Sequence, residues 1–122
     1  APYTTTIDRV TGELEVNLAS FVPASMIAAP GGTTHFKIIS GAAEVDFEGE
    51  TFVVATSETA ILPWNATATA VINQMNAVTA NSTHPLFLAL GVEFYQEING
   101  EMYPLKNGSF NPLSIVKVDG GV

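Results

Sequence analysis

The side chains that could perform acid–base chemistry are few in this sequence of 122 residues. It has two histidines, His35 and His84, and no cysteine. His35 is out of phase with the apolar Phe36 of a strand-like run, and His84 precedes Pro85 where another run begins, so we interpret both as surface or capping residues. No serine lies in a nucleophile elbow. Because no nucleophile, base and set of oxyanion donors can be assigned together, the sequence predicts a protein that is not an enzyme.

Four acidic residues, Glu44, Asp46, Glu48 and Glu50, alternate along one stretch. Alternation places the first two on one face of a strand, and a turn at Glu48-Gly49 would bring Glu50 near them. Calcium binds such oxygens in loops of the Asp-x-Asp-x-Asp-Gly type, and that spacing is not present here. We interpret the cluster as a solvated strand face, with calcium binding as the alternative, and we expect no metal site and no cofactor.

Three aromatic residues are candidates for ligand binding. Trp64 follows Pro63 in LPWNAT, and Tyr95 and Tyr103 flank the Asn99-Gly100 pair. Such rings stack on sugars or anchor protein partners. We favour a core position for Trp64, and the tyrosine pair is the better binding candidate because its strand end is polar. One functional reading is therefore a carbohydrate-binding or protein-binding module.

Composition excludes several classes of partner. Twelve acidic against four basic residues give a net charge of −8, which repels nucleic acid and anionic membrane surfaces. No apolar run approaches the roughly 18 residues of a membrane-spanning helix. Only 13% of the residues are charged and thirteen are Thr, which is unlike an intracellular enzyme, so we expect an extracellular or cell-surface location. Glycosylation-acceptor patterns begin at Asn65, Asn81 and Asn107, but chance produces some in a chain rich in Thr.

Apolar residues recur with period two, and turn signals follow every 8 to 12 residues or so, which is typical of β-sandwiches. The sequence predicts one all-β domain over residues 1–122, a two-sheet antiparallel β-sandwich of immunoglobulin-like type with eight or nine strands. The expected core residues are Leu14, Val16, Phe36, Ile38, Val45, Leu86, Leu88, Leu90, Val92 and Ile115.

Several local features refine this expectation. The apolar positions move from the even face at Ile38 to the odd face at Val45, which predicts a bulge or bend at Gly41. Asn-Gly pairs favour two-residue type I′ turns, so Asn99-Gly100 and Asn107-Gly108 predict a three-stranded meander. Residues 22–32 are rich in Ala, Ser, Pro and Gly, and we interpret them as a loop, either irregular or with a single helical turn.

Three segments carry a resemblance to known sequences: TIDRVTGEL, APGGTTHFKI and STHPLFLALGVEFYQEINGEMYPLKNGSFNPLSIVKV. Together they make the chain resemble the C-terminal half of a group of small uncharacterised bacterial proteins. The resemblance covers nearly the whole chain and brings no activity and no functional residue with it. It implies a portion upstream of residue 1, which agrees with a first residue that is Ala1 and not Met. We expect a processed or excised C-terminal portion of a longer chain.

Strand edges supply the second functional reading. An open sandwich exposes unpaired main-chain groups, and this chain has few basic residues to block them and an uncharged run at Thr4, Thr5 and Thr6. We expect a structural subunit that self-assembles into a homomeric surface structure, filament or particle. The N-terminal segment would add as a strand to a neighbouring subunit, with Tyr3 and Ile7 filling pockets. The alternative is that residues 3 to 9 pair within their own chain.

Overall fold

The fold is all-β, as the sequence predicts. The computed structural model describes residues 3–105 and 114–121. Over those ranges the elements are β1 (Tyr3–Asp8), β2 (Glu13–Leu18), α1 (Pro23–Met26), β3 (His35–Asp46), β4 (Thr51–Glu58), β5 (Leu62–Pro63), β6 (Ile72–Ala77), β7 (Leu86–Ile98), β8 (Glu101–Leu105) and β9 (Ser114–Asp119). The segment interpreted as a loop thus contains the single helical turn α1. No helix among the described residues is long and apolar enough to cross a membrane.

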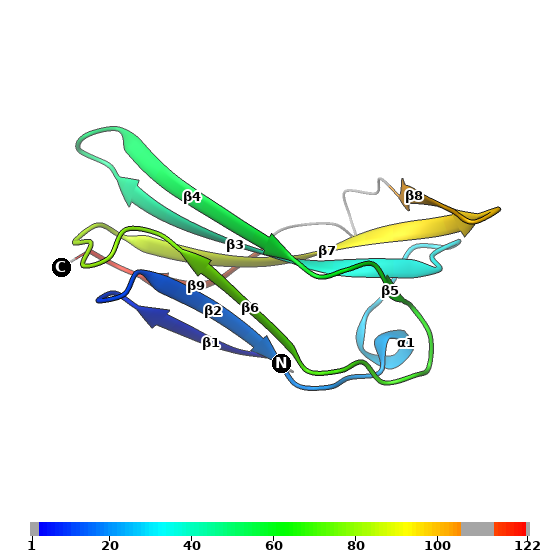
Figure 1. Cartoon of the computed structure of the whole chain (residues 1–122). Helices are drawn as coiled ribbons and strands as arrows, with labels where there is room; N and C mark the ends of the chain where they lie inside the picture. Colours follow the sequence, from blue (N-terminus) through cyan, green and yellow to red (C-terminus); the bar gives the residue numbers. More distant parts are fainter. Residues whose placement is uncertain (1–2, 106–113, 122) are drawn as a thin grey trace.

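The strands form two antiparallel sheets (Figure 1). The smaller sheet has the order β1-β2-β6, and the larger has the order β4-β3-β7-β8, with β5 beside β3 and β9 beside β7. The larger sheet is curled, and its β3–β4 hairpin rises away from the smaller sheet. Its long central strands, β3 and β7, pair over ten residues from His35 opposite Tyr95 to Glu44 opposite Leu86.

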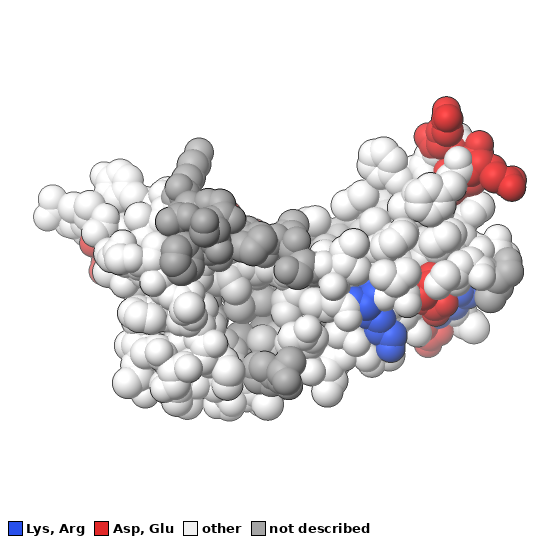
Figure 2. Space-filling view, turned by 180° about the vertical axis from the view of Figure 1, so that it is seen from behind, with Lys and Arg blue, Asp and Glu red and all other residues white. Residues whose placement is uncertain are grey.

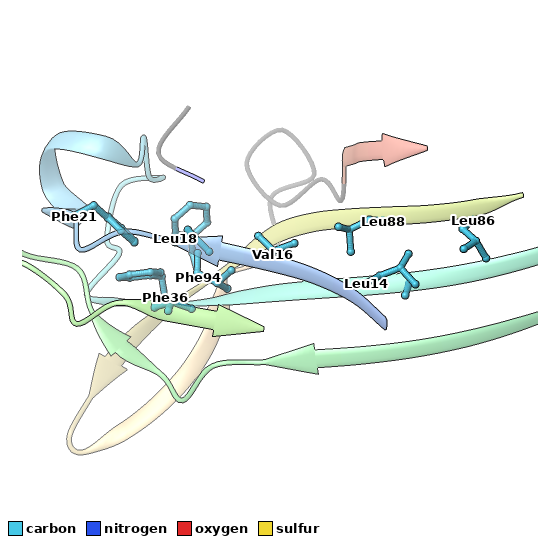
Figure 3. Close-up of a cluster of buried hydrophobic side chains, with 11 residues drawn as sticks. Leu14, Val16, Leu18, Phe21, Phe36, Leu86, Leu88 and Phe94 are labelled. Atoms are coloured by element: carbon cyan, nitrogen blue, oxygen red, sulfur yellow. The ribbon is translucent and has the colours of Figure 1, made fainter. Parts of the chain in front are cut away.

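The two sheets share one apolar core. Side chains of β2, β3 and β7 point toward one another in Figure 3, and Leu14, Phe36 and Leu88 are fully buried there. Phe21, from the segment after β2, packs its ring against Phe36 at a centroid distance of 6.3 Å. The period-two predictions for β2, the first half of β3 and the start of β7 are therefore confirmed.

The β7–β8 turn confirms the Asn-Gly prediction. Ile98 pairs with Glu101, which leaves a two-residue loop, and Asn99 and Gly100 have φ angles of 53° and 82°. Two positive φ angles define the type I′ turn that suits the twist of a hairpin. Asn107-Gly108 lies outside the described residues, so the second turn of the expected meander stays a prediction.

The bulge expected at Gly41 is wrong. β3 pairs with β7 and with β4 without a register shift, and its even-numbered residues are buried from Phe36 to Glu44. Ser40 and Glu44 therefore lie inside, while Ala43 and Val45 lie on the outer face. Val45 is half-buried and not in the core, and Ile115, also expected inside, is 63% exposed. Leu90 and Val92 are half-buried against the core.

Arg9, in the β1–β2 turn, ties the two sheets together. Nη1 of its guanidinium donates to the carbonyls of Ser82 (2.8 Å) and His84 (2.7 Å), just before β7. Nη2 donates to the carbonyls of Asp119 (3.2 Å) and Gly120 (2.7 Å) at the end of β9, and lies 3.0 Å from Oδ1 of Asp119. Because the Arg9 side chain is only 16% exposed, water has little access to the guanidinium and does not readily replace these hydrogen bonds.

Replacing Arg9 should therefore weaken the fold. We expect Arg9→Lys to lower the free energy of unfolding by about 2 kcal/mol or more, because a single ammonium cannot reach both sets of carbonyls. Asp119→Asn is the matched control, since it removes the carboxylate and keeps all four carbonyl bonds, and it should cost less than about 1 kcal/mol. Urea unfolding measures both, and equal losses in the two variants would contradict the role of the carbonyl bonds.

Candidate assembly surface

The inner face of β3 carries a buried carboxylate. Glu44 is 7% exposed; Oε1 accepts a hydrogen bond from the Thr79 main-chain N–H (3.1 Å), and Oε2 accepts one from the Ser82 hydroxyl (2.7 Å). The hydrogen bonding from Thr79, with that from Ser82, outweighs burial and lowers the pKa of Glu44. The interpretation of Glu44 as part of a solvated face is therefore wrong. It connects β3 to the segment between β6 and β7.

A second set of buried polar side chains joins β6 to the larger sheet. Nδ2 of Asn76 donates to the Ser40 hydroxyl (2.9 Å), and Oδ1 of Asn76 accepts from the Ser57 hydroxyl of β4 (2.7 Å). Nε2 of Gln74 donates to the Ile38 carbonyl (3.1 Å). Oε1 of Gln74 is buried with no hydrogen-bond partner among the described residues. The polar side chains on the inner face of β3 therefore have a structural role.

The outer face of the larger sheet is apolar at one end. Cross-strand partners share a face, so the register places Val45 beside Phe52, Ala43 beside Val54 and Phe87, and Phe87 beside Val118. We call the following six residues the outer patch: Phe47, Phe52, Val54, Phe87, Ile115 and Val118. Phe47 is 67% exposed and Phe52 is 73% exposed, and Val54, Ile115 and Val118 are each more than half exposed.

The outer patch borders an open hollow of about 400 Å³. It is lined by small residues, among them Gly41, Ala43 and Ala89, and by the larger Phe47, Phe87 and Ile115. Figure 2 shows that charged side chains are sparse on the face seen from behind, with acidic groups gathered at the tip of the β3–β4 hairpin, at the upper right. Exposed Glu48 and Glu50 belong to that tip.

The opposite end of the outer face is polar and engages Tyr95. Lys37 Nζ lies 3.0 Å from Glu58, 4.0 Å from Glu93 and 5.7 Å from the centroid of the Tyr95 ring. Hydrogen bonding to Tyr95 and to Glu58 raises the pKa of Lys37. The Tyr95 hydroxyl donates to Glu93, and burial, followed by this bond, raises the pKa of Tyr95. Its side chain is only 6% exposed.

The structure does not bring the three predicted binding residues together. Tyr103 pairs with Gln96 and not with Tyr95, so the two tyrosines point to opposite faces of the sheet. Tyr103 is 47% exposed, and its hydroxyl donates to Glu101 (2.8 Å). Trp64 is half-buried against the core and donates from Nε1 to the Ile27 carbonyl (3.1 Å). No shared aromatic shelf is formed by these residues.

The predicted assembly residues, Tyr3 and Ile7, face their own core. β1 pairs with β2 from Tyr3 opposite Leu18 to Asp8 opposite Glu13, and both side chains pack against the core cluster. This is the intrachain pairing that the sequence left as the alternative. A role of β1 in contacts between subunits stays a prediction.

The two histidines belong to opposite ends of the larger sheet. Nδ1 of His35, at the first residue of β3, lies 2.8 Å from the Thr34 hydroxyl. Nε2 of His84 lies 3.8 Å from Oδ2 of Asp46, at the last residue of β3. Within the described part of the chain, no group of three or more His, Cys, Asp or Glu side chains could hold a metal ion.

The sequence contained a signal for the outer patch, which the mistaken prediction of a bulge at Gly41 concealed. Ala43, Val45 and Phe47 continue the odd face of β3, and FVV at the start of β4 is apolar on both faces. An uninterrupted pleat would have placed Val45 and Phe52 together outside the core. No protein-family model matches the chain, and no curated protein matches it.

Glu44 should make the stability depend on pH. Its pKa is lower in the folded chain than the ordinary 4.5, so its stabilising contribution is present above that value and is lost as the pH falls through the folded pKa. We expect Glu44→Gln to cost about 1–3 kcal/mol at neutral pH and progressively less toward acid. Urea unfolding over a pH series measures this difference. Exposed Glu48→Gln is the control, and a cost of Glu44→Gln that does not fall with pH would contradict the assignment.

Proposed function

We propose that this chain is a non-enzymatic structural subunit that self-assembles into a homomeric structure outside the cell or on its surface through β-strand contacts. The single observation that carries the proposal is the outer patch. The exposed parts of its side chains present on the order of 500 Å² of apolar surface, at the upper end of what typical monomers expose. Large exposed patches of this kind mark interaction surfaces.

The charge distribution supports the proposal that another protein covers the outer patch. The described residues that line the hollow beside the outer patch are almost all apolar, and Thr56 is the one polar side chain among them. The chain's net charge of −8 opposes the approach of phosphate and anionic lipid. A face of β-branched and aromatic side chains on a regular sheet is suited to packing against another sheet.

The other parts of the proposal rest on further observations. An immunoglobulin-like sandwich, the finer description of the fold, is supported by one core to which both sheets contribute. The separation of the two histidines supports a non-enzymatic role, since His35 begins β3 and His84 lies beside Asp46 at the other end of that strand. The placement of Tyr95 and Tyr103 on opposite faces favours assembly over a carbohydrate-binding module.

Light scattering over a concentration series tests the proposal. We expect the average mass to rise above that of a monomer as the concentration is raised to about 100 µM, which is the behaviour of a weak to moderate interface. Ile115→Glu should lower the association constant about tenfold or more, because association would then bury a charged side chain in the interface. The matched control is Val71→Glu, which changes a similarly exposed residue outside the outer patch, at 61% against 63%. A wild-type monomer throughout, or equal effects of the two substitutions, would refute the proposal.

A further inference from the structure

The outer edge of β4 has unpaired main-chain groups. β4 pairs with β3 and with no other described strand. Just beyond it, the Thr59 N–H donates to the Ile38 carbonyl (3.0 Å), in the same register. Opposite residues of an antiparallel pair alternate between hydrogen-bonded and non-hydrogen-bonded pairs. The odd-numbered residues of β4 therefore bond to β3, and Phe52, Val54 and Thr56 direct their N–H and C=O groups away from it.

The opposite side of β3 agrees with this phase. The Val45 N–H donates to the Pro85 carbonyl (3.1 Å), so the odd-numbered residues of β3 bond toward β7 and the even-numbered ones toward β4. The register of β3 with β4 contains no shift, so the phase holds along the whole strand. The outward direction of the Val54 main chain thus follows from hydrogen bonds on both sides of β3.

This edge lacks the features that normally prevent pairing. Thr51 to Ser57 contains no charged residue, no Pro and no bulge, whereas proteins usually protect edge strands with one of these. The other candidate edges differ: β8 contains Pro104, β9 contains Lys117 and Asp119, and the apolar side chains of β1 are already packed in the core. On β6, the Met75 carbonyl already accepts a hydrogen bond from the Ser57 hydroxyl (3.0 Å). β4 combines an edge without these features with highly exposed apolar side chains.

We propose that β4 pairs antiparallel with β4 of a second copy of this chain around a two-fold axis at Val53. This inference rests on the proposed function and identifies the first contact between two subunits of the assembly. The axis places Phe52 opposite Val54 of the second copy, and both residues direct main-chain groups to the shared edge. A two-fold axis perpendicular to the sheet keeps outer faces together, so the two outer patches become one continuous surface.

Charge selects this register over its neighbour. An axis at Val54 would place Glu50 opposite Glu58 of the second copy, so two carboxylates would oppose each other. With the axis at Val53, Glu50 lies opposite Thr56, and Glu58 faces the β3–β4 turn, where Glu48 is outside the paired strands. The ion pair of Glu58 with Lys37 in its own chain, at 3.0 Å, is the same in both registers and does not distinguish them.

The contact predicts a weak dimer. One added strand pair buries less than the roughly 800 Å² per partner of stable interfaces, so we expect a dissociation constant on the order of micromolar. The dimer leaves the joined outer patches exposed, and these are available for the further association that the proposed function requires.

Sedimentation equilibrium of two variants at one position tests the pairing. Val54→Pro removes the outward N–H and no hydrogen bond within the chain, and Pro is tolerated on an edge strand in that orientation. Val54→Thr keeps the N–H and a β-branched side chain. We expect Val54→Pro to raise the dimer dissociation constant about tenfold or more, and Val54→Thr to change it by less than about threefold.

Hydrogen exchange of the unmodified chain provides a second measurement that needs no substitution. The amides of Phe52, Val54 and Thr56 should exchange more slowly as concentration rises, while exposed amides outside β4 do not change. An assembly that persists in folded Val54→Pro, together with no protection of the Phe52, Val54 and Thr56 amides in the unmodified chain, would overturn the β4 pairing and leave self-assembly intact. A wild-type chain that is monomeric at every concentration would overturn both.

Discussion

The unbroken pleat of β3 is the constraint on which the rest of the molecule depends. Ten of its twelve residues pair with β7, β4 and β5 pair with its other side, and no register shift interrupts the alternation of side chains. Phe36 and Ile38 therefore enter the core at one end. The same parity forces Ser40 and Glu44 inside at the other end, and it leaves Ala43 and Val45 outside. At this end of β3, polar side chains lie inside and apolar side chains lie outside, and both follow from the regular alternation of side chains along the strand.

The buried polar groups then determine how the smaller sheet is attached. A carboxylate and a hydroxyl on the inner face of β3 need partners, because an unsatisfied buried polar group is costly. Ser82 and Thr79 supply them for Glu44, and Asn76 supplies one for Ser40. Arg9 joins the two sheets at the same end of the molecule, because it donates hydrogen bonds to main-chain carbonyls at the end of β9 and in the segment before β7. The apolar core thus lies between polar connections, which leaves the outer face of the larger sheet free for another role.

Sequence reasoning found the elements whose pattern is local. Leu14 and Val16 on β2, the alternation that opens β7, and the Asn99-Gly100 turn each carry their signal within a few residues. It failed at Gly41 because β3 is apolar on both faces there, so two parities fit the same letters. It also missed Arg9, whose acceptors are main-chain carbonyls between 73 and 111 residues away and have no side-chain signature. The outer patch was missed for the same reason, since the faces of Ala43 and Val45 decide where their partners Val54 and Phe52 lie.

The central claim is that a second copy of the chain pairs with the outer edge of β4. The chain has no cysteine, so Thr56→Cys carrying one spin label reports only distances between molecules. Thr56 is exposed and lies three residues from the axis, so at about 3.3 Å per residue the two Thr56 positions should be about 20 Å apart. Pulsed dipolar spectroscopy should show a narrow distribution near that separation, broadened by the label linkers. No dipolar coupling at concentrations where light scattering detects association, or a much longer distance, would contradict the account.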